Sequence, residues 1–217
     1  MKLVIINGSP RGIKSNSHIL TNWIVEAIEN TLDIHEFFAI ETKKYQAVIN
    51  SITNDCNILI AFPLYTDSMP AILKQLLEAI EVIKGKRKNI RIYYIIQSGF
   101  TGANHCRFVE KYLAYFSKYM GFTYMGTAIS PAGEVLRLMP KFVTRNVQKR
   151  VKQLAENIKQ NELYNEEVLA KLAKREKPNF LFCLLVKSGH FGNGYFKYIL
   201  RKNKVYVMRY NKPYCDV

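Results

Sequence analysis

Residues 1–17 constrain the fold and the function of this chain more than any other segment. An apolar run from Leu3 to Ile6 ends in a loop of Gly, Ser and basic residues, and an amphipathic segment begins at Ser17. This pattern predicts a buried strand that leads through the loop into a helix. The first turn of a helix has unpaired N–H groups and a partial positive charge, so the loop is suited to a phosphate. The candidate phosphate contacts are Ser9, Arg11, Ser15, Asn16 and Ser17, with Lys14 as further charge. The alternative is an ordinary strand–helix turn with a capped helix.

Two well-known phosphate loops do not fit this segment. A Walker A loop needs Gly before the Lys, and Ile13 precedes Lys14. The dinucleotide fingerprint G-x-G-x-x-G fails because Gly8 and Gly12 are four residues apart. The order Gly8-Ser9-Pro10-Arg11 followed by Ser15-Asn16-Ser17 resembles the phosphate loop of the NAD(P)H-dependent FMN reductases of flavodoxin-like fold. The resemblance implies that this loop holds the phosphate of FMN.

Hydrophobic periodicity divides the chain into regularly alternating segments. Strands are expected at about residues 2–7, 34–40, 57–63, 90–97 and 123–130. Helices are expected at about residues 17–30, 44–54, 70–84, 105–120 and 140–160, the last of which could continue past Leu172. Five β-α units predict an α/β fold with a doubly wound parallel sheet. One phosphate loop after the first strand favours the flavodoxin-like strand order 2-1-3-4-5.

Ligands of such sheets bind beyond the carboxyl ends of the strands, so the loop after the third strand is a second candidate. It offers a planar ring both apolar area and polar edge contacts. The candidate residues are Pro63, Leu64, Tyr65, Thr66 and Asp67. The alternative is a plain connection in which Asp67 or Ser68 caps the next helix. The stretch from Pro63 to Pro70 also resembles the FMN reductase and quinone reductase families, where this loop lines the flavin ring.

The loop after the fourth strand is the third candidate. Its two glycines would let the backbone approach a ligand closely. The candidate residues are Ser98, Gly99, Phe100 and Gly102. His105 could donate a hydrogen bond to a flavin oxygen or a substrate, or it could simply begin the next helix. No other residue is assigned a catalytic role.

Four cysteines without any C-x-x-C pair support neither a zinc site nor an iron–sulfur cluster, and no metal site is expected. Scattered thiols fit a reducing compartment. The N-terminal apolar run is too short for a signal peptide, and no apolar run approaches a membrane span. The expected location is cytoplasmic.

The net charge of +15 belongs mainly to the C-terminal part, where residues 133–217 carry 18 Lys/Arg against 7 Asp/Glu. Residues 1–175 are expected to form the flavodoxin-like domain and residues 176–217 a basic aromatic extension. An apolar run, Phe180 to Val186, lies in this extension. It could pack on its own domain or on a second subunit. The resemblance to the flavodoxin-like reductases, which commonly form oligomers, implies the second subunit. It could instead lie on an anionic membrane surface. Nucleic acid is not expected as a partner, because no recognised binding module is present.

The resemblance implies an FMN-dependent oxidoreductase that passes electrons from NADPH or NADH to a small acceptor. The acceptor could be a quinone, a nitro or azo compound, free flavin or a metal complex. Because the flavin carries such chemistry, no catalytic triad or metal cluster is required. One alternative is a flavodoxin-like electron carrier that does not oxidise NAD(P)H, although flavodoxins are acidic and this chain is basic. Another is a module without flavin that binds a membrane or a partner.

Overall fold

The computed structural model describes residues 1–28, 31–131, 133, 136, 141–174, 176, 180, 183–184 and 190–211. The chain divides into two compact units, Met1–Lys177 and Pro178–Val217. The first unit contains the sheet and the three candidate loops. The second contains the basic extension and is described separately below.

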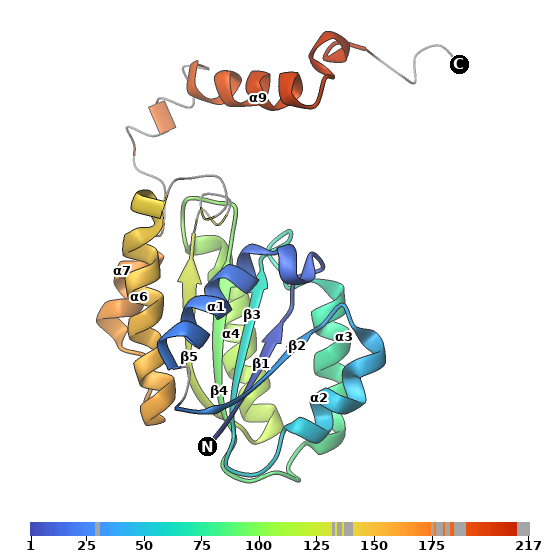
Figure 1. The fold of residues 1–217 in the computed structure, drawn as a ribbon, viewed down its shortest axis with the longest axis vertical. Helices are drawn as coiled ribbons and strands as arrows, with labels where there is room; N and C mark the ends of the chain where they lie inside the picture. Colours follow the sequence, from blue (N-terminus) through green and yellow to red (C-terminus); the bar gives the residue numbers. More distant parts are fainter. Residues whose placement is uncertain are drawn as a thin grey trace. The chain divides into compact units, whose positions relative to one another are not determined.

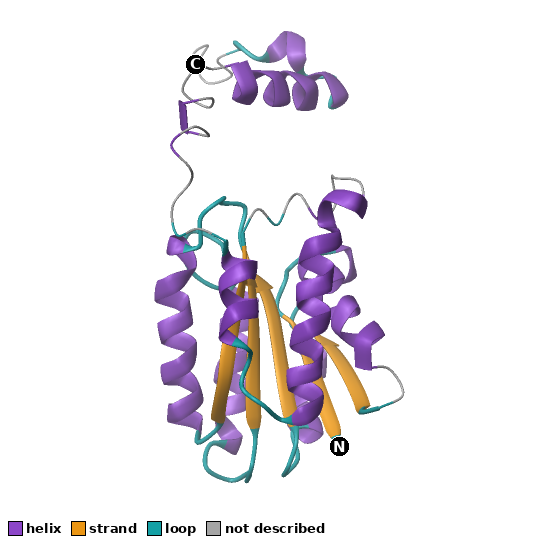
Figure 2. Ribbon diagram, turned by 90° about the vertical axis from the view of Figure 1, so that its left-hand side faces the viewer, coloured by secondary structure: helices purple, strands orange, loops and turns teal. Residues whose placement is uncertain are grey.

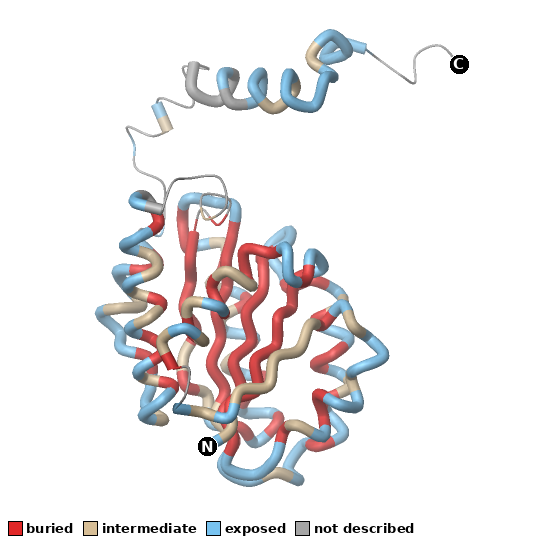
Figure 3. Tube along the Cα trace, viewed as in Figure 1, coloured by how far each residue is buried: buried red, intermediate tan, exposed pale blue. Residues whose placement is uncertain are grey.

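The first unit is built on a five-stranded parallel sheet with the order β2-β1-β3-β4-β5, as predicted (Figure 1). Its strands are β1 (Lys2–Asn7), β2 (Asp33–Phe38), β3 (Asn57–Pro63), β4 (Arg91–Gln97) and β5 (Thr123–Ser130). The strand β3 is buried along its whole length, whereas β2 at the sheet edge is mostly half-buried. Figure 3 shows this difference, with β3 in red and β2 mainly in tan.

Helices cover both faces of the sheet (Figure 2). The α-helices among the described residues of the first unit are α1 (Asn16–Ile28), α2 (Tyr45–Ser51), α3 (Ala71–Ile80), α4 (Arg107–Met120), α6 (Lys141–Gln160) and α7 (Glu166–Ala173). Alternate residues of each buried strand point to opposite faces. Ile58, Ile60 and Phe62 of β3 therefore face α2, α3 and α4, while Leu59 and Ala61 face α1 and α6. The two hydrophobic cores hold the strands, and so their ends, in fixed register.

The predicted continuation of the last long helix past Leu172 is wrong. The helix α6 ends at Gln160, and Asn161 adopts a left-handed φ of 61° that no helix continues. The chain after this turn is hydrogen-bonded to β5 of the sheet: Tyr164 N–H donates to the Met125 carbonyl at 2.9 Å. Asn165 begins α7 by accepting the Val168 N–H at 3.1 Å, a side-chain cap. Local turn chemistry thus divides a segment whose hydrophobic period suggested one helix.

The second unit contains the helix α9 (His190–Lys202) and a short 3-10 turn, Tyr206–Met208. The turn is joined to the end of α9 by backbone bonds, one of them from Val205 N–H to the Leu200 carbonyl at 3.0 Å. Most of the apolar run Phe180 to Val186 lies outside the described residues, but the side chains of Phe180 and Leu184 are exposed. None of the helices in the described ranges combines the length and the apolar character that a membrane crossing demands.

Gly8, directly after β1, is packed closely against two other elements, β3 and α3. A Cβ atom at this position would be 2.7 Å from Leu73 Cδ2 in α3 and 2.9 Å from Phe62 Cβ in β3. Both distances are shorter than a carbon–carbon contact allows. Glycine is therefore required here for the loop to leave the sheet against the start of α3.

Replacing Gly8 by Ala should lower the free energy of unfolding by about 1–3 kcal/mol, because Phe62 Cβ is fixed by the strand and cannot move away. Urea unfolding of both proteins measures the change. Gly99→Ala is the matched control: nothing lies within 4 Å of its Cβ position, and the change should stay within about 0.5 kcal/mol. Equal unfolding midpoints for the two variants would contradict the close approach at Gly8.

Candidate functional site

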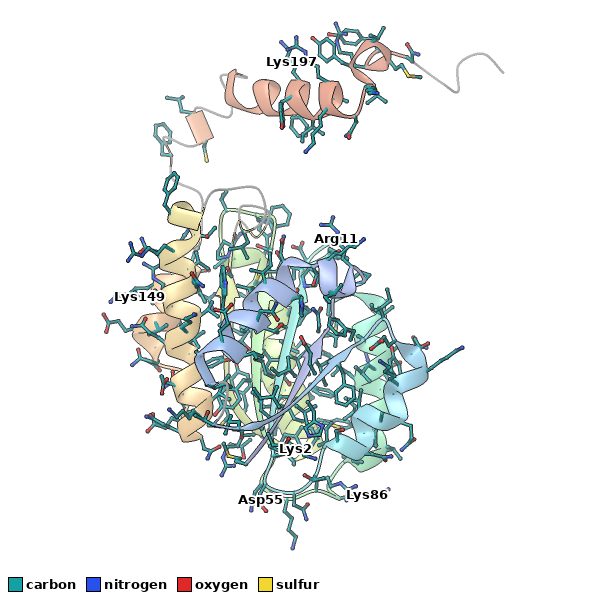
Figure 4. The ribbon with its side chains drawn as sticks, in the orientation of Figure 1. Lys2, Arg11, Asp55, Lys86, Lys149 and Lys197 are labelled. Atoms are coloured by element: carbon teal, nitrogen blue, oxygen red, sulfur yellow. The ribbon has the colours of Figure 1, made fainter. Side chains whose placement is uncertain are left out.

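Three loops meet at the carboxyl edge of the sheet. They follow β1, β3 and β4. Backbone hydrogen bonds hold the first two loops to the neighbouring strands: Gly8 N–H donates to the Ala61 carbonyl of β3 at 2.8 Å, and Leu64 N–H to the Gln97 carbonyl of β4 at 2.7 Å. Figure 4 shows Arg11 at this edge, and Lys2 and Lys86 at the opposite one. The strands therefore bring together the three candidate loops that the sequence separates.

Asn7, the last residue of β1, organises the first loop. Its side chain is fully buried; Oδ1 accepts the Ser9 N–H at 2.9 Å, and Nδ2 donates to Ser15 Oγ at 3.1 Å. One amide thus ties both ends of the loop together. The sequence analysis did not select Asn7, although a polar residue at the end of an apolar strand is a usable signal.

Two of the predicted phosphate contacts have bonds within the loop. Ser15 Oγ accepts the His18 N–H at 3.1 Å and so caps α1. Ser9 Oγ accepts the Arg11 N–H at 3.3 Å. The capped-helix interpretation is thus correct for Ser15, and contact of either hydroxyl with a ligand stays a prediction.

The next two residues, Asn16 and Ser17, begin α1 and are buried, with 3% and 0% of their surfaces exposed. Asn16 Oδ1 and Ser17 Oγ have no hydrogen-bond partner, and they are two of only five such buried side-chain atoms in the described residues. A buried hydroxyl without a partner is costly unless a ligand or water completes it. The Ser17 hydroxyl can donate, and its place in the first turn of a helix that follows the Arg11 loop suits a phosphate.

The second loop makes a tight two-residue turn. Tyr65 and Ser68 exchange backbone hydrogen bonds of 2.8 and 3.1 Å. Thr66 and Asp67 between them have left-handed φ angles of 49° and 60°. Such angles are rare for a β-branched residue, and strained backbone of this kind is concentrated at functional sites. The turn leaves the Tyr65 side chain 43% exposed at the sheet edge.

The alternative in which Asp67 or Ser68 caps the next helix is wrong. The N-cap position of α3 is Pro70, and no side chain caps it. Pro63 and Leu64 are buried at the base of the loop, whereas Tyr65, Thr66, Asp67 and Ser68 are exposed. The exposed part of this loop is thus free of a role in beginning α3.

His105 joins the second and third loops. Its Nδ1 lies 3.0 Å from Asp67 Oδ1, and its ring stacks on Phe100 with a centroid distance of 4.1 Å. It stands in a short 3-10 turn, Asn104–Cys106, ahead of α4. When Nδ1 donates to the carboxylate, Nε2 is the ring nitrogen left for another partner. Three predicted site residues, Asp67, Phe100 and His105, therefore form one cluster.

The close approach at Gly102 is made to the protein's own chain, and contact of this residue with a ligand stays a prediction. A Cβ atom at Gly102 would lie 2.4 Å from the Glu176 carbonyl oxygen, which also accepts the Asn104 N–H at 3.3 Å. The Glu176 carboxylate in turn accepts the Arg107 Nε–H at 3.1 Å. Gly99, by contrast, is open to solvent, and Ser98 is buried beneath it.

The neighbouring thiol of Cys106 is not an activated nucleophile. It is fully buried, and burial raises its pKa to about 11, so the thiolate is disfavoured. Across the described ranges, no three His, Cys, Asp or Glu side chains are grouped closely enough to hold a metal ion.

A cavity of about 410 Å³ lies between the second loop and α4. One side of the cavity is formed by Asp67, Ser68 and Met69 of the second loop and by Lys74 of α3. The other side is formed by Phe108 and Tyr112 of α4. It adjoins the Asp67–His105 pair but includes no residue of the first loop. The cavity thus offers mainly apolar space next to the second and third loops.

Comparison with known proteins agrees with this architecture. A family model described as flavodoxin-like fold matches residues 1–158. No curated protein sequence matches the chain.

Several solved structures are similar in fold. An NADPH-quinone reductase from P. pentosaceus is 21% identical, with 71% of this chain and 98% of that chain covered and a TM-score of 0.53. An FMN-dependent NADH-azoreductase from Bacillus anthracis, in complex with FMN, is 19% identical, with 73% and 100% covered and a TM-score of 0.55. An NADH:FMN oxidoreductase in its apo form is 14% identical, with 82% and 96% covered and a TM-score of 0.58.

These likenesses concern the fold, and the family model covers the sheet, its first loop and most of α6. The chain therefore belongs to the family with the flavodoxin-like fold.

Proposed function

We propose that the protein binds FMN at the carboxyl edge of its sheet and transfers electrons from NADPH or NADH to a small acceptor. The observation that carries this proposal is the buried Ser17 hydroxyl, which has no partner and lies in the first turn of α1 beside the Arg11 loop. The similar structures described as FMN-dependent or quinone-reducing enzymes support the same cofactor and reaction class.

The first loop would hold the phosphate of FMN. The Ser17 hydroxyl would donate to a phosphate oxygen, and the Asn16 amide could turn about its terminal torsion to present Nδ2. Arg11 adds a charge that pairs with phosphate in a planar, two-donor geometry. Asn7 and Ser15 act through the loop, because their mutual bond fixes its shape before any ligand arrives.

The second and third loops would hold the flavin ring. Tyr65 offers an exposed aromatic face at the sheet edge, and the stacked pair Phe100–His105 offers a second aromatic surface nearby. A bound flavin supplies the redox chemistry by accepting a hydride and passing electrons on. Asp67 fixes the orientation of the His105 ring, so that Nε2 can bond to the ring edge or to an acceptor.

Among the acceptors, a quinone or another planar aromatic compound fits the surroundings best. The cavity beside Asp67 is lined by Met69, Phe108 and Tyr112, which offer apolar and aromatic contact. Nitro and azo aromatic compounds share this requirement, and free flavin and metal complexes are further candidates. An electron carrier without NAD(P)H oxidation is the second candidate function.

Two titrations test the proposal. The purified protein is mixed with FMN under anaerobic conditions and flavin fluorescence is followed; NADPH or NADH is then added and the visible flavin absorbance is followed. Quenching followed by rapid bleaching, and recovery of colour on addition of a quinone, is the expected result. Quenching without bleaching would assign the protein to electron carriers, and no quenching would remove FMN from the proposal.

Ser17→Ala should weaken FMN binding about ten- to a hundredfold, because a hydrogen bond to a charged phosphate contributes about 1.5–3 kcal/mol. The apoprotein should be equally or more stable, since the hydroxyl has no partner to lose. Ser117→Ala is the matched control: this buried hydroxyl donates to the Leu113 carbonyl at 2.7 Å and contacts Tyr94 Oη at 2.9 Å. It should cost about 1–3 kcal/mol of stability and leave FMN affinity unchanged. The reverse pattern would show that Ser17 has a structural role only.

Arg11→Ala should also lower FMN affinity about ten- to a hundredfold, since a charge-assisted contact of about 1.5–3 kcal/mol is removed. Lys86→Ala removes the same charge at the opposite edge of the sheet and should change affinity little (Figure 4). Fluorescence quenching gives both dissociation constants. An unchanged affinity in the Arg11 variant would exclude this side chain from the site.

Tyr65→Ala should weaken FMN binding about two- to tenfold and shift its reduction potential, because an aromatic contact contributes about 0.5–1.5 kcal/mol beyond its area. The fold should survive, since the side chain is exposed in a loop whose turn is held by backbone bonds. Tyr115→Ala, on the exposed face of α4, is the control. Loss of the fold without a separate effect on flavin would favour a purely structural loop.

A further inference from the structure

The C-terminal unit presents a surface that combines positive charge with exposed apolar side chains. We define residues 196–210 as the basic-aromatic segment; it includes the second half of α9 and the 3-10 turn Tyr206–Met208. Its cations are Lys197, Arg201, Lys202, Lys204 and Arg209, and it contains no Asp or Glu. Its exposed large apolar side chains are Phe196, Tyr198, Val205, Val207, Met208 and Tyr210.

Charges and rings alternate within this segment. The Arg209 guanidinium lies 4.1 Å from the centroid of the Tyr206 ring and 4.6 Å from that of Tyr210, and Arg201 lies 4.9 Å from Tyr206. These cation–π contacts bring positive charge directly beside apolar surface. Val207 is 85% exposed and Met208 58%, so aliphatic side chains stand in water next to the cations.

Charge decides which class of partner can cover this surface. Residues 178–217 carry seven Lys/Arg against one Asp, and residues 1–177 carry 25 Lys/Arg against 16 Asp/Glu. A second copy of the segment would bring five more cations and no carboxylate, and the first unit is positive overall. Like charges repel, so an anionic partner is favoured over another part of this protein.

The aliphatic side chains distinguish between anionic partners. Single-stranded nucleic acid binds aromatic rings by stacking its bases on them, but it has few apolar groups that would cover the exposed Val205, Val207 and Met208. A membrane surface accepts aromatic and aliphatic side chains at the level of its headgroups while its anionic lipids attract Lys and Arg.

We propose that the basic-aromatic segment binds the surface of a membrane that contains anionic lipids. The segment lies along the surface without crossing it, with Val207, Met208 and Tyr210 entering the headgroup region and the five cations pairing with lipid phosphates. This inference does not depend on the flavin site.

Co-sedimentation of the full chain with vesicles tests the proposal. Phosphatidylcholine vesicles with about a quarter phosphatidylglycerol should bind the protein, and vesicles of phosphatidylcholine alone should bind it far more weakly. Raising the salt concentration should release it, because screening weakens the attraction. Equal binding to both vesicles, or no binding to either, would overturn the proposal.

Two full-chain variants locate the surface. Exchange of all five cations of the segment for Gln should weaken vesicle binding at least about a hundredfold, since each cation near an anionic surface contributes about fivefold. Val207→Ser combined with Met208→Ser should weaken it about tenfold by removing apolar contact. The matched control removes five exposed cations of the first unit, Lys43, Lys86, Lys88, Arg145 and Lys149, by exchange for Gln. Equal losses in the control would assign binding to total charge and contradict the proposal.

Two further measurements distinguish a membrane from a second subunit and from nucleic acid as the partner of the segment. Light scattering of the full chain and of the Val207→Ser/Met208→Ser variant shows whether the segment holds subunits together; an oligomer that the variant dissociates, without vesicle binding, would identify a subunit interface instead. A mixed-sequence single-stranded DNA oligonucleotide that displaces the protein from vesicles and binds it more tightly would favour nucleic acid. Either result overturns the membrane proposal.

Discussion

All five strands of the sheet run in the same direction, and this constraint places every candidate ligand residue. Parallel strands need crossover helices, which cover both faces and leave the strand interiors almost entirely apolar. Polar chemistry is therefore confined to the strand ends, and the carboxyl ends all lie at one edge. Asn7 at the end of β1 shows the consequence, since a single buried amide shapes the whole first loop through Ser9 and Ser15.

The same edge collects features that do not stabilise the isolated fold. Thr66 and Asp67 adopt left-handed angles, and Asn16 and Ser17 bury polar atoms without partners. Left-handed backbone at a β-branched residue and buried polar atoms without partners both cost free energy in the protein alone. Their location at one edge of the sheet, in the loops that carry Arg11, Tyr65 and His105, supports the proposal of a phosphate-bearing aromatic cofactor.

The two units differ in where their apolar side chains lie. The first buries alternate strand residues in two cores and turns its polar loops to one edge. The second, from Pro178 onward, has exposed apolar side chains beside a dense set of cations. Glu176, just before this unit, is held by Arg107 and lies against Gly102 of the third loop. Glu176 therefore belongs to the first unit and is packed against the loop that carries Phe100 and His105.

The sequence by itself determined the sheet order, the limits of β1, β3 and β5, and the three candidate loops, because strand periodicity and loop composition are local properties. It also singled out Ser17 and Arg11. It could not determine which polar groups satisfy one another. Ser15 caps α1, Asp67 pairs with His105, and Gly102 makes room for Glu176, and each result depends on residues brought close by the tertiary structure. Hydrogen bonds and close contacts depend on distances in space, which the sheet sets only once it has formed.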